Sequence, residues 1–221
     1  MSLWIKICGN TSLEDAQLVA EAGADAAGFV FAPSPRRVTP EQVAAIVPQL
    51  PPAIEKIGVF VDASFGEITS VVESCSLTGV QLHFNAPRDL PMKIRGRLGP
   101  ELRILRVVHF DGAGVSAAFG PNYETDVDAI LLDSRVGETV GGTGMTFDWA
   151  VAATTLAQNP RARGRRFIAA GGLTPNNVAR AIAALHPWGV DAVSGVESMP
   201  GRKDPAKVRA FIANARAAAS A

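Results

Sequence analysis

The stretch Leu3-Trp4-Ile5-Lys6-Ile7-Cys8-Gly9-Asn10-Thr11 is an apolar run that ends abruptly in a cysteine, a glycine and a signal for the start of a helix. The run predicts a strand over Leu3–Ile7, and Thr11 and Glu14 have the spacing of a capping box for the helix that follows. Cys8 is therefore expected at the carboxyl end of a strand and beside a helix N-terminus. The helix dipole and the free amide groups there favour a thiolate over a thiol.

Short apolar runs that predict strands recur along the whole chain, with helical patterns between them. The predicted strands are Leu3–Ile7, Ala26–Phe31, Lys56–Val61, Gly79–Leu82, Arg103–Val108, Ala129–Leu132, Arg166–Ala169 and Ala192–Val196. Because they are apolar nearly throughout, they indicate a parallel sheet covered by helices. Eight such units within 221 residues predict an α/β fold, a single-domain (β/α)8 TIM barrel that spans residues 1–221.

Three helix starts are marked by a capping side chain followed by proline, at Thr39-Pro40, Thr174-Pro175 and Asp204-Pro205. Proline suits the first turn of a helix, where its missing N–H is not needed. Each start follows a predicted strand, so the three support a regular alternation of strands and helices.

An open, doubly wound sheet is the alternative architecture. A dinucleotide-binding sheet of that kind opens its first helix with G-x-G-x-x-G and binds its ligand at one switch point. That motif is absent after the first strand here, and polar or glycine residues follow nearly every predicted strand. The barrel is therefore preferred.

Composition and charge exclude several classes of function. The 21 Lys and Arg residues balance the 21 Asp and Glu residues, and no basic cluster is interleaved with aromatics, so no nucleic-acid partner is expected. We find no signal-peptide pattern and no apolar run near the ~20 residues that span a bilayer, which predicts a cytoplasmic protein without a membrane partner. The two cysteines, Cys8 and Cys75, are expected as free thiols.

The residues that follow the strands are the candidates for chemistry, because the loops at the carboxyl ends of the strands form the active site of a barrel. Cys8 follows the first strand, Arg36 and Arg37 follow the second, His83 the fourth and Asp133 the sixth. Asp133 emerges from an apolar strand, and partial burial there would raise its pKa and let it act as an acid. A loop cap or an ion pair is the other interpretation of Asp133, and a small buried side chain the other interpretation of Cys8.

Glycine-rich turns follow the last three strands: Gly141-Gly142-Thr143-Gly144, Gly171-Gly172 and Ser194-Gly195. Glycine lets backbone amides approach an oxyanion closely, and the loops after strands seven and eight are the usual phosphate position on this fold. We therefore expect Gly142, Gly144, Gly171, Gly172, Ser194 and Gly195 to bind a phosphate group. The alternative is that these glycines only make tight turns.

Taken together, motifs in order along nearly the whole chain resemble the phosphoribosylanthranilate isomerase family of tryptophan biosynthesis. The matching stretches are Lys6-Ile7-Cys8-Gly9-Asn10-Thr11, Gly28-Phe29-Val30-Phe31, Ser34-Pro35-Arg36-Arg37, Gly58-Val59-Phe60-Val61, Val80-Gln81-Leu82-His83, Leu131-Leu132-Asp133-Ser134, Gly141-Gly142-Thr143-Gly144, Thr146-Phe147-Asp148-Trp149, Ala170-Gly171-Gly172-Leu173, Ser194-Gly195-Val196-Glu197 and Pro200-Gly201-Arg202-Lys203-Asp204.

The resemblance implies an isomerase that converts N-(5-phosphoribosyl)anthranilate, an aminoaldose, into the corresponding aminoketose by an Amadori rearrangement, without a cofactor or a metal. It implies Cys8 as general base, Asp133 as general acid and Arg37 as the partner of the anthranilate carboxylate, with Arg36 the alternative. His83 is a substrate-lining residue or a structural histidine. The partner is a phosphorylated small molecule, and the chain is a monomer or a homodimer.

Two positions depart from the pattern of the family. Phe84 stands where the family usually has glycine, and Val193 replaces the first of two serines before the glycine of the eighth-strand motif. Neither change removes a proposed catalytic group, but Phe84 puts the backbone of its loop in question.

Three other functions are compatible with the same scaffold. An aldolase needs a Schiff-base lysine inside the barrel, and the strands offer only Lys6 and Lys56, near their starts. A metal-dependent epimerase needs several converging ligands, which three histidines in all do not supply. A catalytically silent phosphate-binding protein would lack the thiol or the acid, and both are present.

Overall fold

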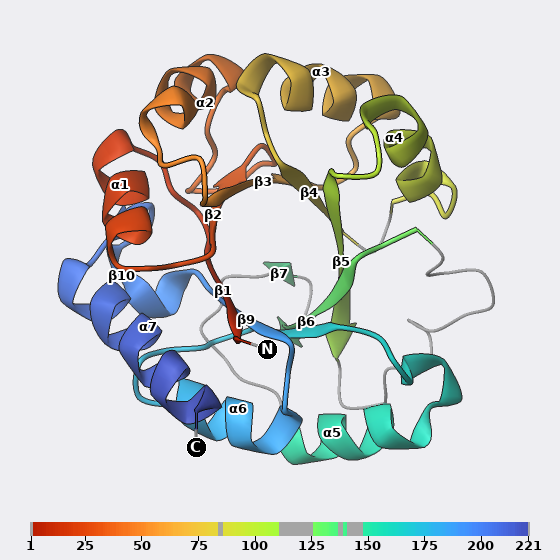
Figure 1. Ribbon diagram of the computed structural model, residues 1–221, viewed down its shortest axis with the longest axis vertical. Helices are drawn as coiled ribbons and strands as arrows, with labels where there is room; N and C mark the ends of the chain where they lie inside the picture. The colour runs from red at the N-terminus through yellow and green to blue at the C-terminus, as the bar shows by residue number, and fades with distance from the viewer. Residues whose placement is uncertain (1, 84–85, 111–125, 137–138, 141–147, 221) are drawn as a thin grey trace.

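Among the described residues, eight parallel strands close into a ring at the centre of the molecule (Figure 1). The structure is a computed structural model that describes residues 2–83, 86–110, 126–136, 139–140 and 148–220. The ring consists of β1 (Trp4–Ile7), β2 (Ala26–Val30), β3 (Glu55–Phe60), β4 (Gly79–Leu82), β5 (Arg103–Phe110), β6 (Ala129–Val136), β8 (Phe167–Ala169) and β9 (Gly189–Ala192). Its spatial order is β5-β4-β3-β2-β1-β9-β8-β6, and pairing of β5 with β6 closes it. The predicted barrel is confirmed.

Helices surround the strands and form the outer layer in Figure 1. They are α1 (Leu13–Glu21), α2 (Pro40–Ile46), α3 (Phe65–Cys75), α4 (Leu90–Leu98), α5 (Trp149–Gln158), α6 (Val178–Leu185) and α7 (Pro205–Ala219). The connection after β5 falls on residues 111–125, outside the described ranges. No helix in the described part of the chain combines the length and the apolar character needed to cross a membrane.

Smaller elements complete the fold. Short 3-10 turns η1 (Val47–Gln49), η3 (Pro160–Ala162) and η4 (Ser194–Val196) connect larger elements, and β7 (Thr139–Val140) pairs antiparallel with β6. After η4, β10 (Glu197–Met199) and β11 (Arg202–Lys203) form an antiparallel hairpin that precedes α7. This hairpin brings Glu197 and Lys203 to the mouth of the barrel.

Alternation along the strands separates the inside of the barrel from the layer beneath the helices. In β1, Ile5 and Ile7 join the apolar cluster under the helices, whereas Trp4 belongs to an inner cluster. The inner cluster consists of Trp4, Ala26, Ile57, Leu105, Val107, Ala129, Leu131, Ile168 and Ala170. Because side chains alternate along a strand, Lys6 and Cys8 share the inner face with Trp4.

Two of the predicted helix starts are confirmed, and two are wrong by a few residues. Thr39 forms a capping box with Gln42, and Asp204 caps α7. At α1 the cap is Ser12, whose side chain accepts from the Asp15 N–H, whereas the Thr11 hydroxyl donates to the Gly201 carbonyl at 2.6 Å. Thr11 is thus used to hold the β10–β11 hairpin rather than the helix.

The segment at Thr174-Pro175 precedes α6 instead of starting it. Asn177 spans this segment, since its Oδ1 accepts from the Thr174 N–H at 2.8 Å and its Nδ2 donates to the Gly172 carbonyl at 2.9 Å. These bonds make a turn, and α6 begins only at Val178. Local capping residues signalled a helix, but the side chain three residues later decided where the helix begins.

The eighth strand is Gly189–Ala192, so the prediction of Ala192–Val196 was displaced toward the C-terminus. Ser194–Val196 forms a 3-10 turn instead. Pairing with β1 explains the difference, because Trp4 lies opposite Gly189 and Ile7 opposite Ala192. A Cβ at Gly189 would lie 2.8 Å from the Trp4 carbonyl oxygen, so the glycine permits this close approach.

Candidate active site

A cavity of about 460 Å³ opens at the carboxyl ends of the strands, where the sequence places its chemistry. It is lined by Cys8, Val30, Ala32, Pro33, Ser34, Arg36, Val59, Val61, Asp62, Gln81, His83, Leu131, Asp133, Asp191 and Val193. The structure therefore brings the predicted Cys8, His83 and Asp133 together in one cavity. Arg36 lines this cavity as well, and Arg37 does not.

Cys8 is held at the base of the cavity by the backbone around it. Its N–H donates to the Ala192 carbonyl at 2.9 Å, which continues the β1–β9 ladder beyond β1, and its carbonyl accepts from Lys203 Nζ at 2.6 Å. The Cys8 residue is only 3% exposed. A Cβ at Gly28 would lie 2.5 Å from Cys8 Sγ, so the glycine on β2 makes the space that the sulfur occupies.

The environment of the Cys8 thiol is buried and holds nearby cations. Burial raises the pKa of Cys8 above its usual value, and the nearby ammonium groups of Lys6 and Lys203 oppose that rise. The helix α1 begins at Leu13, after its cap Ser12, so the predicted effect of the helix dipole on Cys8 stays a prediction. Cations from the interior of the barrel favour the thiolate here.

Sequence reasoning missed Lys6 and Asp191 as part of the site. Lys6 is fully buried and its Nζ lies 2.9 Å from Asp191 Oδ1, while Asp191 is 5% exposed. Sequence reasoning put Lys6 near the start of its strand and therefore far from the active site. Because β1 is only four residues long, Lys6 lies just two residues before Cys8. The signal for Asp191 is an acidic residue inside a short apolar strand, visible only once the eighth strand is placed at Gly189–Ala192.

A second ionic group joins Arg36, Glu197 and Lys203 at the rim. Arg36 binds Glu197 through two bonds, from Nε to Oε1 at 2.8 Å and from Nη2 to Oε2 at 2.7 Å. Lys203 Nζ lies 3.1 Å from the same carboxylate. Although burial opposes ionisation of Glu197, Arg36 and Lys203 hold its pKa below the usual range. Glu197 thus fixes the guanidinium plane of Arg36 at the edge of the cavity.

Asp133 connects the main cavity to a small one of about 30 Å³ among the glycine turns. The small cavity is lined by Asp133, Ala170, Gly171, Gly172, Leu173, Asp191, Val193 and Ser194. Gly171 and Gly172 have φ of +76° and +65°, a left-handed conformation that glycine adopts without strain. Gly195 lies against this turn, since a Cβ there would be 1.9 Å from the Leu173 carbonyl oxygen.

His83 is a neutral group in this structure. Burial, followed by the proximity of His109, lowers the pKa of His83 to about 4, and the two rings lie 5.9 Å apart between centroids. A neutral imidazole near pH 7 does not serve as a cation for a carboxylate or a phosphate. His83 therefore lines the cavity as a neutral side chain.

Several residues singled out in the sequence lie outside the described ranges or outside the site. Gly142 and Gly144 fall within 141–147 and Phe84 within 84–85, both outside the described ranges. Cys75 is buried at the end of α3, where its Sγ lies 3.3 Å from the Pro40 carbonyl oxygen, and it is not bonded to Cys8. In the described parts of the chain, no three His, Cys, Asp or Glu side chains gather in a way that could hold a metal ion.

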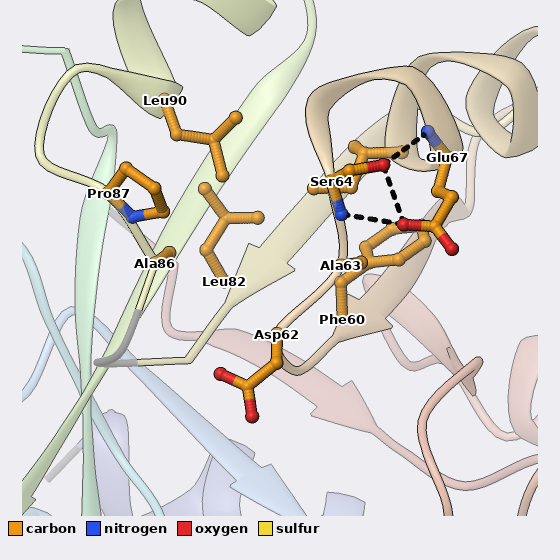
Figure 2. Close-up of a pocket in the computed structure, with 10 residues that line it drawn as sticks. Phe60, Asp62, Ala63, Ser64, Glu67, Leu82, Ala86, Pro87 and Leu90 are labelled. Atoms are coloured by element: carbon orange, nitrogen blue, oxygen red, sulfur yellow. Dashed lines mark hydrogen bonds between the residues drawn. The ribbon is translucent and has the colours of Figure 1, made fainter.

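Another cavity, of about 370 Å³, lies between the loops after β3 and β4 (Figure 2). Its walls are largely apolar, and its polar residues Ser64 and Glu67 bind each other in the capping box of α3. Asp62 borders both this cavity and the main one, and its carboxylate points away from Ser64 and Glu67 in Figure 2. Because Ser64 and Glu67 bind each other and Asp62 points away from them, the polar groups of this cavity do not converge on one point.

The sequence profile described as "N-(5'phosphoribosyl)anthranilate (PRA) isomerase" matches residues 5–214. The chain belongs to this family. A PRA isomerase from Pelobacter propionicus is 44% identical over 209 residues, which cover 94% of this chain and 93% of the relative. The predicted family resemblance is confirmed.

Solved PRA isomerase structures share the fold at similar identity. The crystal structure of phosphoribosyl anthranilate isomerase from Thermotoga maritima has a TM-score of 0.85 and 39% identity, covering 97% of this chain and 99% of that one. A second structure of a phosphoribosyl anthranilate isomerase, in complex with reduced 1-(o-carboxyphenylamino)-1-deoxyribulose 5-phosphate, has a TM-score of 0.81 and 37% identity over the same shares.

The lowered pKa of His83 predicts a pH-dependent loss of stability. The folded-state pKa of about 4 lies below the ordinary value of 6.5, so the unfolded chain binds the proton more readily. The stability that neutral His83 contributes is complete above about pH 6.5 and is lost as the pH falls toward about 4, at most about 3 kcal/mol. Urea unfolding at about pH 7.5 and about pH 4.5 should show this loss, and His83→Gln should remove it.

His186 is the matched control, because it is exposed at the end of α6. His186→Asn should lose as much stability on acidification as the parent protein does. An equal loss in His83→Gln and the parent would show that the burial of His83 does not cause the pH dependence.

Proposed function

We propose that the chain converts N-(5-phosphoribosyl)anthranilate into 1-(o-carboxyphenylamino)-1-deoxyribulose 5-phosphate, an Amadori rearrangement in tryptophan biosynthesis. The observation that carries the proposal is that Cys8 and Asp133 face one cavity in a barrel of the PRA isomerase family. The direct test is the loss of anthranilate fluorescence when the purified protein meets the aminoaldose. No loss of fluorescence above the spontaneous rate would contradict the proposal.

Asp133 and Cys8 supply the acid and the base. Asp133 protonates the ring oxygen of the ribose, so the C1–O bond breaks and the sugar opens to a Schiff base. The Cys8 thiolate then takes the proton from C2 to give an enolamine, which tautomerises to the aminoketose. Each step is a proton transfer coupled to a change of bonds within the substrate, so the proposed chemistry uses neither a cofactor nor a metal.

Arg36 is the better partner for the anthranilate carboxylate than the expected Arg37. Arg36 lines the cavity, whereas Arg37 is exposed and absent from its lining. Glu197 engages Nε and Nη2 of Arg36, which leaves Nη1 of the guanidinium for a further acceptor. An arginine held in one plane binds a carboxylate with little loss of side-chain entropy.

The glycine turns are proposed to bind the phosphate. Among the described residues, the backbone amides of Gly171 and Gly172 donate to no protein acceptor, and the turn borders Asp133 and Ser194 in the small cavity. Exposed amides in such a turn suit a phosphate oxygen. Gly195 contributes the close packing of this turn, and Gly142 and Gly144 are proposed to contribute from the loop after β6.

The proposed catalytic unit is the single barrel of residues 1–221 in the cytoplasm. Its named site residues all belong to one chain, so the proposed chemistry is the same in a monomer and in a homodimer. His83 is proposed to shape the substrate cavity as a neutral side chain.

Removal of either catalytic group should abolish most of the activity. Cys8→Ala and Asp133→Asn should each lower kcat at least ~100-fold, because a positioned acid or base contributes about 10²–10⁴-fold. Steady-state kinetics with circular dichroism as a check on folding measures this. A folded variant that keeps near-parental kcat would rule out the assigned role.

Arg36 and Arg37 form a matched pair for the carboxylate. Arg36→Lys should lower kcat/KM, and Arg36→Ala should lower it further. The alanine variant should lose about 2–4 kcal/mol of transition-state stabilisation, because the desolvated carboxylate of the substrate loses its partner. Arg37→Ala should change kcat/KM by less than about threefold. The reverse ranking of the two alanine variants would return the assignment to Arg37.

Gly28 should be required for the position of the base. A methyl group at Gly28 would lie 2.5 Å from Cys8 Sγ and must displace the sulfur, and a misplacement of about 1 Å costs ~10²-fold in rate. Gly28→Ala should therefore lower kcat by ~10²-fold in a protein that still folds. Steady-state kinetics measures kcat, and circular dichroism checks the fold. Gly66→Ala is the control, because no atom lies within 4 Å of its added Cβ. Equal kcat in both variants would contradict the tight placement of Cys8.

A further inference from the structure

A buried pair of charges lies directly beneath the proposed base, and the proton transfers described above do not use it. Lys6 and Asp191 are 0% and 5% exposed, and their charged atoms lie 2.9 Å apart. Burying two charges is costly, and pairing them recovers that cost only in part. A pair of well-packed apolar residues would stabilise the fold equally well. The presence of two charges here therefore indicates a role other than stability.

The geometry directs the pair at Cys8. Lys6 and Cys8 are two residues apart along the chain at β1 and face the same side, and the strand register places Asp191 opposite Lys6. The Lys6 ammonium group interacts with both the Asp191 carboxylate and the Cys8 thiol. Asp191 lines the main cavity beside Cys8. Lys6 therefore shares one face of the strand with Cys8 while its ammonium group is bound to a fixed carboxylate.

The ionic cluster beside Cys8 holds one more cation than it holds carboxylates. Lys6 on β1, Arg36 after β2 and Lys203 on β11 are cations, and they are paired with the carboxylates of Asp191 and Glu197. Asp62, Asp133 and His83 also line the cavity but lie outside this cluster, and the histidine is neutral. Within this ionic cluster of Lys6, Arg36, Lys203, Asp191 and Glu197, one positive charge stays uncompensated until Cys8 becomes a thiolate.

We propose that Lys6 and Asp191 are positioning residues that set the proton affinity of Cys8 from opposite directions. Lys6 stabilises the thiolate, and Asp191 competes for the same ammonium group and keeps the sulfur basic enough to take a proton from carbon. The proposal rests on the role of Cys8 as the base of the proposed function.

The directions of the pKa shifts agree with this division of roles. Burial raises the pKa of Cys8, the Lys6 ammonium group lowers it and the Asp191 carboxylate raises it. Although burial disfavours the ammonium ion, Asp191 and Cys8 together hold the pKa of Lys6 above its usual range. The Asp191 carboxylate and the Cys8 thiolate therefore both favour the ammonium form of Lys6.

The test titrates the Cys8 thiol directly in the full chain with Cys75→Ser, so that Cys8 is the remaining cysteine. Thiolate absorbance and the rate of iodoacetamide modification are followed against pH. Lys6→Met should raise the Cys8 pKa by about 1 or more, a tenfold fall in thiolate at a given pH. Asp191→Asn should lower the Cys8 pKa. A purely structural pair would not shift the titration in opposite directions.

Two further variants keep the test decisive. Lys56→Met removes another buried strand lysine, whose Nζ donates to the Pro51 and Pro52 carbonyls, and should leave the Cys8 titration unchanged. The double variant Lys6→Met/Asp191→Leu leaves no unpaired charge, so it serves if a single variant does not fold. Its Cys8 pKa should fall between those of the two single variants.

The titration separates this inference from the proposed function, because it needs no isomerase activity. Opposite shifts of the Cys8 pKa in Lys6→Met and Asp191→Asn support the proposed role of the two residues, even in a protein without activity on the aminoaldose. Shifts in the same direction, or shifts equal to that of Lys56→Met, overturn the inference even if the isomerase is active. In an active enzyme, the alkaline displacement of the Cys8 titration in Lys6→Met should reappear in the pH profile of kcat/KM.

Discussion

The parallel pairing of β1 with β9 is the constraint on which the site depends. It sets Lys6 opposite Asp191 and continues beyond β1 through the bond from the Cys8 N–H to the Ala192 carbonyl. A shift of one residue would turn Lys6 and Cys8 from the inside of the barrel toward the helices, because side chains alternate along a strand. Gly189 permits this register, since any Cβ there would press on the Trp4 carbonyl.

Charge pairs connect this register to the rest of the rim. Lys203 of the β10–β11 hairpin binds the Cys8 carbonyl and Glu197, and Glu197 in turn holds Arg36 of the loop after β2. Each buried charge in this chain of contacts has a partner, so that removal of one leaves another uncompensated in a low dielectric. The hairpin, the β2 loop and the thiol are therefore positioned as one unit.

Much of the architecture could be predicted from the chain alone. The first seven predicted strands begin within one residue of the observed ones, because buried parallel strands are short apolar runs between turn signals. The eighth failed because the apolar residues of Ala192–Val196 look like a strand, whereas pairing with β1 ends the strand at Ala192. Helix starts failed where a capping residue bonded elsewhere, as Thr11 does with Gly201.

The sequence by itself determined the barrel, the family and the presence of Cys8 and Asp133 toward the carboxyl ends of β1 and β6, because periodicity and local motifs are properties of neighbouring residues. Only the tertiary structure decided that Arg36 and not Arg37 lines the cavity, since adjacent residues in a loop have no fixed sides until the loop is anchored. It also brought Lys6 and Asp191 together, although they are 185 residues apart along the chain, and placed both near Cys8. The proton affinity of a thiol depends on burial and on nearby charges, and neither exists before the chain folds.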